Sequence, residues 1–86
     1  MPKISLSIEQ NVGKKVKTLK DSGPIEIGSD FKSSNQFLNT LSEYQQLSEK
    51  HNESASDENV AYIMVYAEDE SAESIVLEIE NYIEEL

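Results

Sequence analysis

The sequence predicts a small α+β domain in which a short sheet packs against two helices, in the order ββ(β)αβα. Three observations lead to this prediction. Apolar and polar residues alternate near the N-terminus, apolar residues recur at helical spacing in two later segments, and a continuous β-branched and aromatic run separates those segments. The chain has 86 residues, the size of one domain, so residues 1–86 are expected to fold as a single unit.

The N-terminal segment predicts a β-hairpin. Apolar and polar side chains alternate from Lys3 to Glu9, as in a strand with one buried face. Gly13 can take the positive φ that closes a short loop, and residues 14–20 then form the return strand. The alternative is a helix over residues 10–20, where three apolar residues also recur at helical spacing. Gly13 and two β-branched residues disfavour so short a helix, so we prefer the hairpin.

The middle of the chain predicts a brief strand and then a helix. Residues 25–27 alternate apolar and acidic side chains after a turn-like segment, which indicates a short third strand. The spacing of Ser33 and Gln36 is that of a capping box, and apolar residues follow at helical intervals. Lys50 and His51 lie where cations stabilise the end of a helix. We therefore predict a helix over about residues 33–51.

The C-terminal part predicts one more strand and a second helix. Residues 59–67 form a continuous run rich in β-branched and aromatic side chains, typical of a central strand covered on both faces or of a strand whose outer face meets a partner. Acidic residues then precede an apolar stripe of helical period, which predicts a helix over about residues 70–85.

Charge is distributed unevenly along the chain. Residues 1–32 hold six lysines and four acids, a net charge of +2, whereas residues 33–86 hold thirteen acids and one lysine, a net charge of −12. A C-terminal part this acidic repels phosphates, so we expect no direct binding to nucleic acid or to an anionic membrane. It favours a basic protein partner, although acidity that serves only solubility would leave the same pattern.

Signatures of catalysis are missing from the sequence. The chain has one histidine, no cysteine and no glycine-rich phosphate loop, and its acidic runs lack the spacing of a calcium loop. We therefore expect a protein that is not an enzyme and that needs no cofactor and no metal. The longest apolar stretch is far shorter than the roughly 20 residues of a membrane-spanning helix, so we expect a cytoplasmic location.

The candidate partner-binding residues are acids and tyrosines of the C-terminal part. The acids of the predicted second helix repel one another, and the last two oppose the helix dipole, so local stability does not explain them. Tyr62 and Tyr66 share one face of the predicted strand, and they become a contact patch if no helix covers that face. The candidate acids are Glu68, Asp69, Glu70, Glu73, Glu80, Glu84 and Glu85.

Two local resemblances accompany this pattern. Residues 56–60 resemble a short piece of the phage uracil-DNA glycosylase inhibitors, which are acidic DNA mimics, but the order of predicted elements here does not follow that family. Tyr66 and Glu70 resemble the Tyr-x-x-x-Asp/Glu export signal of type VII secretion substrates and their small helical partners. Membership of that family implies that residues 59–67 are helical.

The sequence thus predicts a non-catalytic, protein-binding inhibitor or adaptor. Its acidic C-terminal half would dock on a basic, nucleic-acid-binding protein and occupy phosphate sites there, as a nucleic-acid mimic of the phage anti-defence, anti-CRISPR-like type does. The alternative is a structural or type VII secretion partner that assembles through apolar helix or strand faces. A homo-oligomer is compatible with either prediction.

Overall fold

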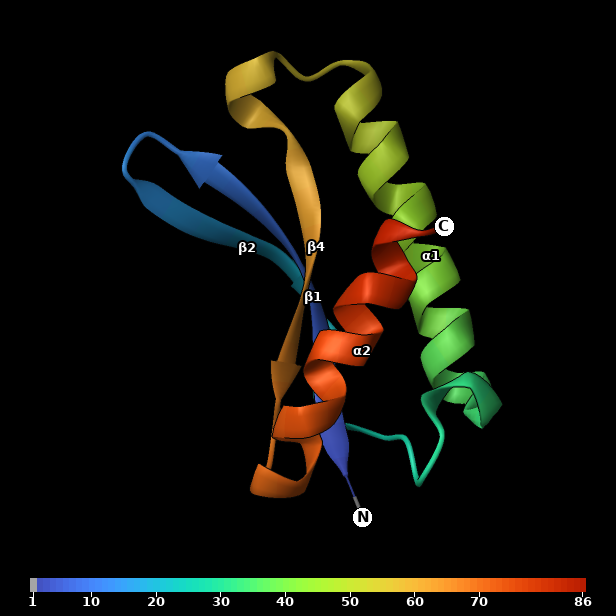
Figure 1. Cartoon of the computed structure of the whole chain (residues 1–86). Helices are drawn as coiled ribbons and strands as arrows, with labels where there is room; N and C mark the ends of the chain where they lie inside the picture. Colours follow the sequence, from blue (N-terminus) through green and yellow to red (C-terminus); the bar gives the residue numbers. More distant parts are fainter. Residues whose placement is uncertain (1) are drawn as a thin grey trace.

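The computed structural model describes residues 2–86 and confirms the α+β class, with a four-stranded antiparallel sheet and two α-helices (Figure 1). The strands are β1 (Lys3–Val12), β2 (Lys15–Asp21), β3 (Ile25–Glu26) and β4 (Ala61–Ala67), and the helices are α1 (Asn35–Glu53) and α2 (Glu73–Glu84). Three 3-10 turns complete the chain: η1 (Phe31–Ser33), η2 (Asp57–Asn59) and η3 (Glu70–Ala72).

The N-terminal hairpin forms as predicted, and residues 15–21 are a strand rather than a helix. Gly13 adopts a φ of 64°, in the left-handed region that glycine occupies at little cost. The tip of the hairpin projects beyond the rest of the molecule in Figure 1, and every residue of β2 is exposed. We call residues 11–21, the tip of the hairpin and β2, the hairpin arm; all of them lie exposed rather than packed in the core.

The central strand of the sheet is β1, not the strand predicted at residues 59–67. β2 pairs with the C-terminal part of β1 and β3 with its N-terminal end, so these two short strands share one edge. β4 pairs along most of β1 on the other edge and has no second strand neighbour within residues 2–86. The continuous apolar run indicated either a central strand covered on both faces or a strand whose outer face meets a partner. The first alternative is wrong, because β4 is an edge strand that packs on helices on one face only.

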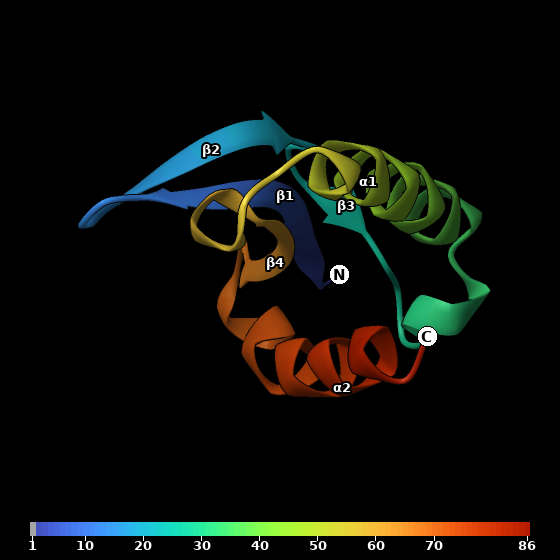
Figure 2. The same ribbon diagram turned by 90° about the horizontal axis from the view of Figure 1, so that it is seen from above.

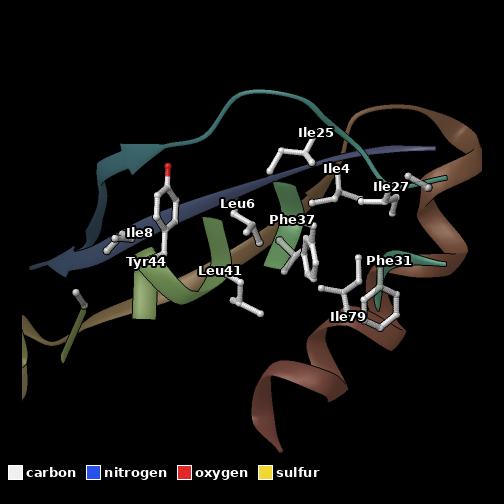
Figure 3. Close-up of a cluster of buried hydrophobic side chains, with 13 residues drawn as sticks. Ile4, Leu6, Ile8, Ile25, Ile27, Phe31, Phe37, Leu41, Tyr44 and Ile79 are labelled. Atoms are coloured by element: carbon white, nitrogen blue, oxygen red, sulfur yellow. The ribbon is translucent and has the colours of Figure 1, made fainter. Parts of the chain in front are cut away.

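Both helices cover the same face of the sheet (Figure 2). Ile4, Leu6 and Ile8 of β1 point into this layer and belong to one buried cluster with Phe37 from α1 and Ile79 from α2 (Figure 3). All five side chains are buried. At about 25 cal/mol per Å² of apolar surface removed from water, burial of this set supplies the main driving force for docking the helices.

The start of α1 differs by one residue from the predicted capping box. Ser34, not Ser33, is the N-cap, and its Oγ accepts a hydrogen bond of 3.2 Å from the backbone N–H of Phe37. Ser33 belongs instead to η1, which Asp30 caps, and the Ser33 hydroxyl donates to the Asp30 carboxylate at 3.1 Å. The preceding 3-10 turn thus uses the first serine and leaves the second to cap the α-helix.

Candidate functional site

The predicted site residues lie in three places around β4 and α2. Glu68, Asp69 and Glu70 form the connection between these elements, and Glu73, Glu80, Glu84 and Glu85 lie along or just beyond α2. Tyr62 and Tyr66 lie on the opposite side of the sheet from α2, as the register of β4 requires. The acids of α2 and the tyrosines are therefore on different sides of the sheet.

Three of the glutamates follow one side of α2. Glu73, Glu80 and Glu84 are seven and four residues apart, a spacing that places them on the same side of a helix, and all three are exposed. We call these three residues the glutamate row. Glu85 points elsewhere: it lines a separate hollow with Lys32 and Tyr82. The structure therefore divides the predicted acidic set between two sides of the helix.

The glutamate row has no cationic partner within the described chain. The two ion pairs among residues 2–86 join Lys3 to Glu26 at 3.9 Å and Lys20 to Glu43 at 3.2 Å, and neither includes an acid from α2. Most lysines lie on the hairpin arm, away from α2. The negative charge of the row therefore remains available to a cation from outside the protein.

Asp69 has a local structural role. Its carboxylate accepts hydrogen bonds from the backbone N–H of Ala72 at 3.0 Å and from the hydroxyl of Ser71 at 2.7 Å, so it caps η3, the turn that leads into α2. The hydrogen bond from Ser71, followed by the backbone bonds, holds the pKa of Asp69 below its ordinary value. Capping accounts for this residue without a partner.

The tyrosines lie on a sheet face that neither helix covers. Their neighbours Ser5, Ser7 and Glu9 alternate with the core residues of β1 and pair across the strands with Tyr66, Met64 and Tyr62, so the six share one face. We call this set the outer sheet face. The hydroxyl of Tyr62 donates to the Asn11 side chain at 3.0 Å, and the hydroxyl of Tyr66 donates to the Glu9 carboxylate.

Glu9 is a feature of this face that sequence reasoning missed. Only 6% of the residue is exposed, and its carboxylate also accepts a hydrogen bond of 2.7 Å from the Ser7 hydroxyl. Tyr66 stands opposite Ser5, so its side chain must pass over Ser7 to reach Glu9. The Tyr66 side chain thereby covers Ser7 and Glu9, which are both buried. The alternation of β1 indicated only a solvent-facing acid, because the diagonal reach of Tyr66 depends on strand register.

The Tyr66–Glu9 hydrogen bond also changes the acidity of the phenol. Donation to the carboxylate, assisted by burial, raises the pKa of Tyr66 from 10.0 to about 12. Loss of the phenolic proton would place two negative groups side by side. Tyr66 therefore stays neutral and keeps its hydrogen bond throughout the physiological pH range.

Metal-binding clusters and membrane-spanning helices are absent from the described chain. Within residues 2–86, no group of three or more metal-ligating side chains is close enough to hold an ion. Neither α1 nor α2 combines the length and the apolar character needed to cross a membrane. The single histidine, His51, lies with Nε2 3.1 Å from the carbonyl oxygen of Asn59, a contact that joins the end of α1 to η2.

Comparison of the chain with protein-family models, with curated proteins and with solved structures finds no match.

Proposed function

We propose that this protein is a non-catalytic binding module that docks on a basic, nucleic-acid-binding protein and inhibits it by occupying its phosphate sites. The observation that carries the proposal is the glutamate row, whose three carboxylates are exposed on one side of α2 and unpaired within the described chain. Lysine and arginine side chains that normally hold phosphates can pair with such carboxylates. Complementary charge would also speed the encounter of the two proteins.

The dipole of α2 supports a functional origin for part of this charge. Glu84 and Glu85 lie at the C-terminal end, where the partial charge of the helix is negative and acids are destabilising. Among the described residues, no basic side chain occupies the last turn of α2. Such an arrangement lowers the stability of the free protein, and a basic partner would remove that cost on binding.

The test is capture of the partner by the tagged protein from a nuclease-treated lysate of the source organism, with elution by stepped salt and identification by mass spectrometry. We expect a basic nucleic-acid-binding protein that elutes below about 0.5 M salt, because exposed charge pairs are screened. The captured protein should lose DNA or RNA binding as the inhibitor is added.

The control for this test changes the same amount of charge elsewhere. Replacement of the glutamate row by glutamine should reduce capture about ten-fold, given the modest energy of each exposed pair. The matched variant Glu49→Gln/Glu53→Gln/Glu58→Gln carries the same charge change on α1 and η2 and should capture normally. Equal capture by both variants, or retention at high salt, would contradict the proposal.

The outer sheet face favours a second candidate, a structural partner that assembles through apolar contacts. Met64 and Tyr66 lie on this face without a covering helix, and 44% of Tyr66 is exposed. Such assembly would be insensitive to salt and lost in Tyr62→Ala or Tyr66→Ala. The type VII form of this candidate lacks support, because the helix that the resemblance implies at residues 59–67 is the strand β4.

A further inference from the structure

Along its outer edge, β4 leaves backbone hydrogen-bonding groups without partners among residues 2–86. The backbone N–H of Glu68 donates to the Lys3 carbonyl at 2.9 Å. Because hydrogen-bonded pairs alternate along an antiparallel ladder, the backbone N–H and C=O groups of the even-numbered residues of β4 point toward β1, and those of the odd-numbered residues point away from it. Ala61, the first outward residue, bonds through both its N–H and its C=O to the side chain of Asn52. Ile63 and Val65 have no such partner among the described residues.

This edge lacks the features by which sheets prevent unwanted pairing. The seven residues of β4 include no charged side chain and no proline, whereas the edge strand β2 carries lysines at positions 15, 17 and 20. Lysines on an edge strand discourage the addition of another strand, and an apolar edge without them favours it. Of these two edges, β4 is therefore the one that can accept a strand.

A groove follows the open edge. It has a volume of about 250 Å³ and is lined by Ile63, Met64 and Val65 of β4 and by Glu80, Ile83 and Glu84 of α2. Ile63 and Val65 point to the helix side of the sheet and Met64 to the other side, so a groove touching all three must run along the strand edge. Its lining combines four apolar residues with two members of the glutamate row, Glu80 and Glu84.

These features specify the chemistry of an occupant. A strand added to β4 would direct alternate side chains toward α2, where the stems of lysine or arginine can cover Ile63 and Ile83 while their charged groups reach Glu80 and Glu84. The intervening side chains would extend the outer sheet face beside Met64, a position that suits apolar residues. The matching segment is extended and alternates basic with apolar residues.

We infer that β4 binds its partner by strand addition: an extended segment of alternating basic and apolar residues pairs with Ile63 and Val65 and places its cations against Glu80 and Glu84. This inference rests on the proposed function and names the segment of the basic partner that the site takes. Charge argues against a second copy as the occupant, because two-fold pairing of β4 would bring together the glutamate rows of two chains that each carry a net charge of −10.

The test uses two synthetic peptides of about eight residues, the length of a typical strand. One alternates valine and lysine, and the other has the same sequence N-methylated at its central residues, which keeps every charge but removes the N–H donors. Binding is measured by calorimetry and by amide hydrogen exchange of the full chain. We expect the first peptide to bind at least about ten-fold more tightly and to slow exchange at the amides of Ile63 and Val65.

The outcomes separate this inference from the proposed function. Equal binding of the two peptides, weakened by Glu80→Gln/Glu84→Gln but not by Glu49→Gln/Glu53→Gln, would overturn strand addition and leave electrostatic docking intact. If neither peptide binds, or if both glutamine pairs behave alike, the acidic surface is not a docking site and both ideas fail. Concentration-dependent dimerisation that protects Ile63 and Val65 without peptide would show that a second copy occupies the edge.

Discussion

At the scale of single residues, the outer sheet face is organised by one buried carboxylate. Glu9 is held by hydroxyls from Ser7 and Tyr66 rather than by a lysine or arginine. Two donors compensate part of the cost of removing a charge from water, because each hydrogen bond to a charged group is stronger than a neutral one. The hydrogen bond also holds the side chain of Tyr66 along the sheet, on the same face as Met64.

Replacement of Tyr66 by phenylalanine tests this arrangement. The variant keeps the ring but leaves Glu9 with only the Ser7 donor. The free energy of unfolding should fall by only about 1 kcal/mol, because Tyr66 is partly exposed and solvent screens the interaction. Chemical denaturation measures the change. Tyr62→Phe is the matched control, because its exposed bond goes to a neutral amide, and it should cost less.

The same hydrogen bond gives a pH dependence with a defined sign. The pKa of Tyr66 rises to about 12 in the folded protein from 10.0, so its stabilising effect is complete below pH 10 and is lost as pH rises toward 12. Burial also raises the pKa of Tyr44, so tyrosinate absorbance should show two of the four tyrosines titrating late, and Tyr66→Phe should remove one of these two steps. Titration of all tyrosines near pH 10 in the folded protein would contradict the hydrogen bond.

At the scale of elements, local signals placed most helices and strands correctly. The hairpin and both helices lie within a few residues of their predicted bounds, because periodicity and turn residues act over short stretches of chain. The errors are at junctions where two caps compete, as at Ser33 and Ser34, and where a 3-10 turn precedes the helix, as at η3. These details depend on how neighbouring turns share hydrogen-bond donors.

The start of α2 offers a test at this scale. Asp69→Ala removes the acceptor for the N–H of Ala72 and should lower the melting temperature by a few degrees, whereas Asp69→Asn keeps an acceptor and should cost less. Because the pKa of Asp69 is lowered in the folded state, its effect is complete above its ordinary pKa of 3.8 and fades as pH falls below that value. Thermal melts at neutral and acidic pH would reveal the loss; the difference between Asp69→Ala and wild type should shrink in acid.

At the scale of the whole molecule, charge is separated in space as it is in sequence. The lysines of the hairpin arm lie away from the acids of α2, and the described chain forms only two ion pairs. Most acids of the described chain therefore lack an ion-pair partner, and the molecule keeps its net charge of −10. Self-repulsion of this kind lowers stability at low ionic strength and keeps the acidic surface open to a partner.

Removal of charge from the end of α2 should make the free protein more stable. Glu84→Gln/Glu85→Gln relieves an unfavourable interaction with the helix dipole and should raise the free energy of unfolding by about 0.5 kcal/mol at low salt, with a smaller gain at high salt. Glu73→Gln is the matched control: it removes an acid from the first turn of α2, where the dipole favours negative charge, and should lower the free energy of unfolding. A loss of stability in the double variant, measured by denaturation, would show that these acids serve the fold.

By itself, the sequence determined the α+β class, the order of elements and the uneven charge, because hydrophobic period, turn residues and formal charge are local properties. It also placed Tyr62 and Tyr66 on one strand face. Only the tertiary structure decided that β1 is central, that β4 has an open edge beside Glu80 and Glu84, and that Tyr66 covers Glu9. Strand order and register join residues more than fifty positions apart, and the alternation within a single strand carries no information about its neighbour.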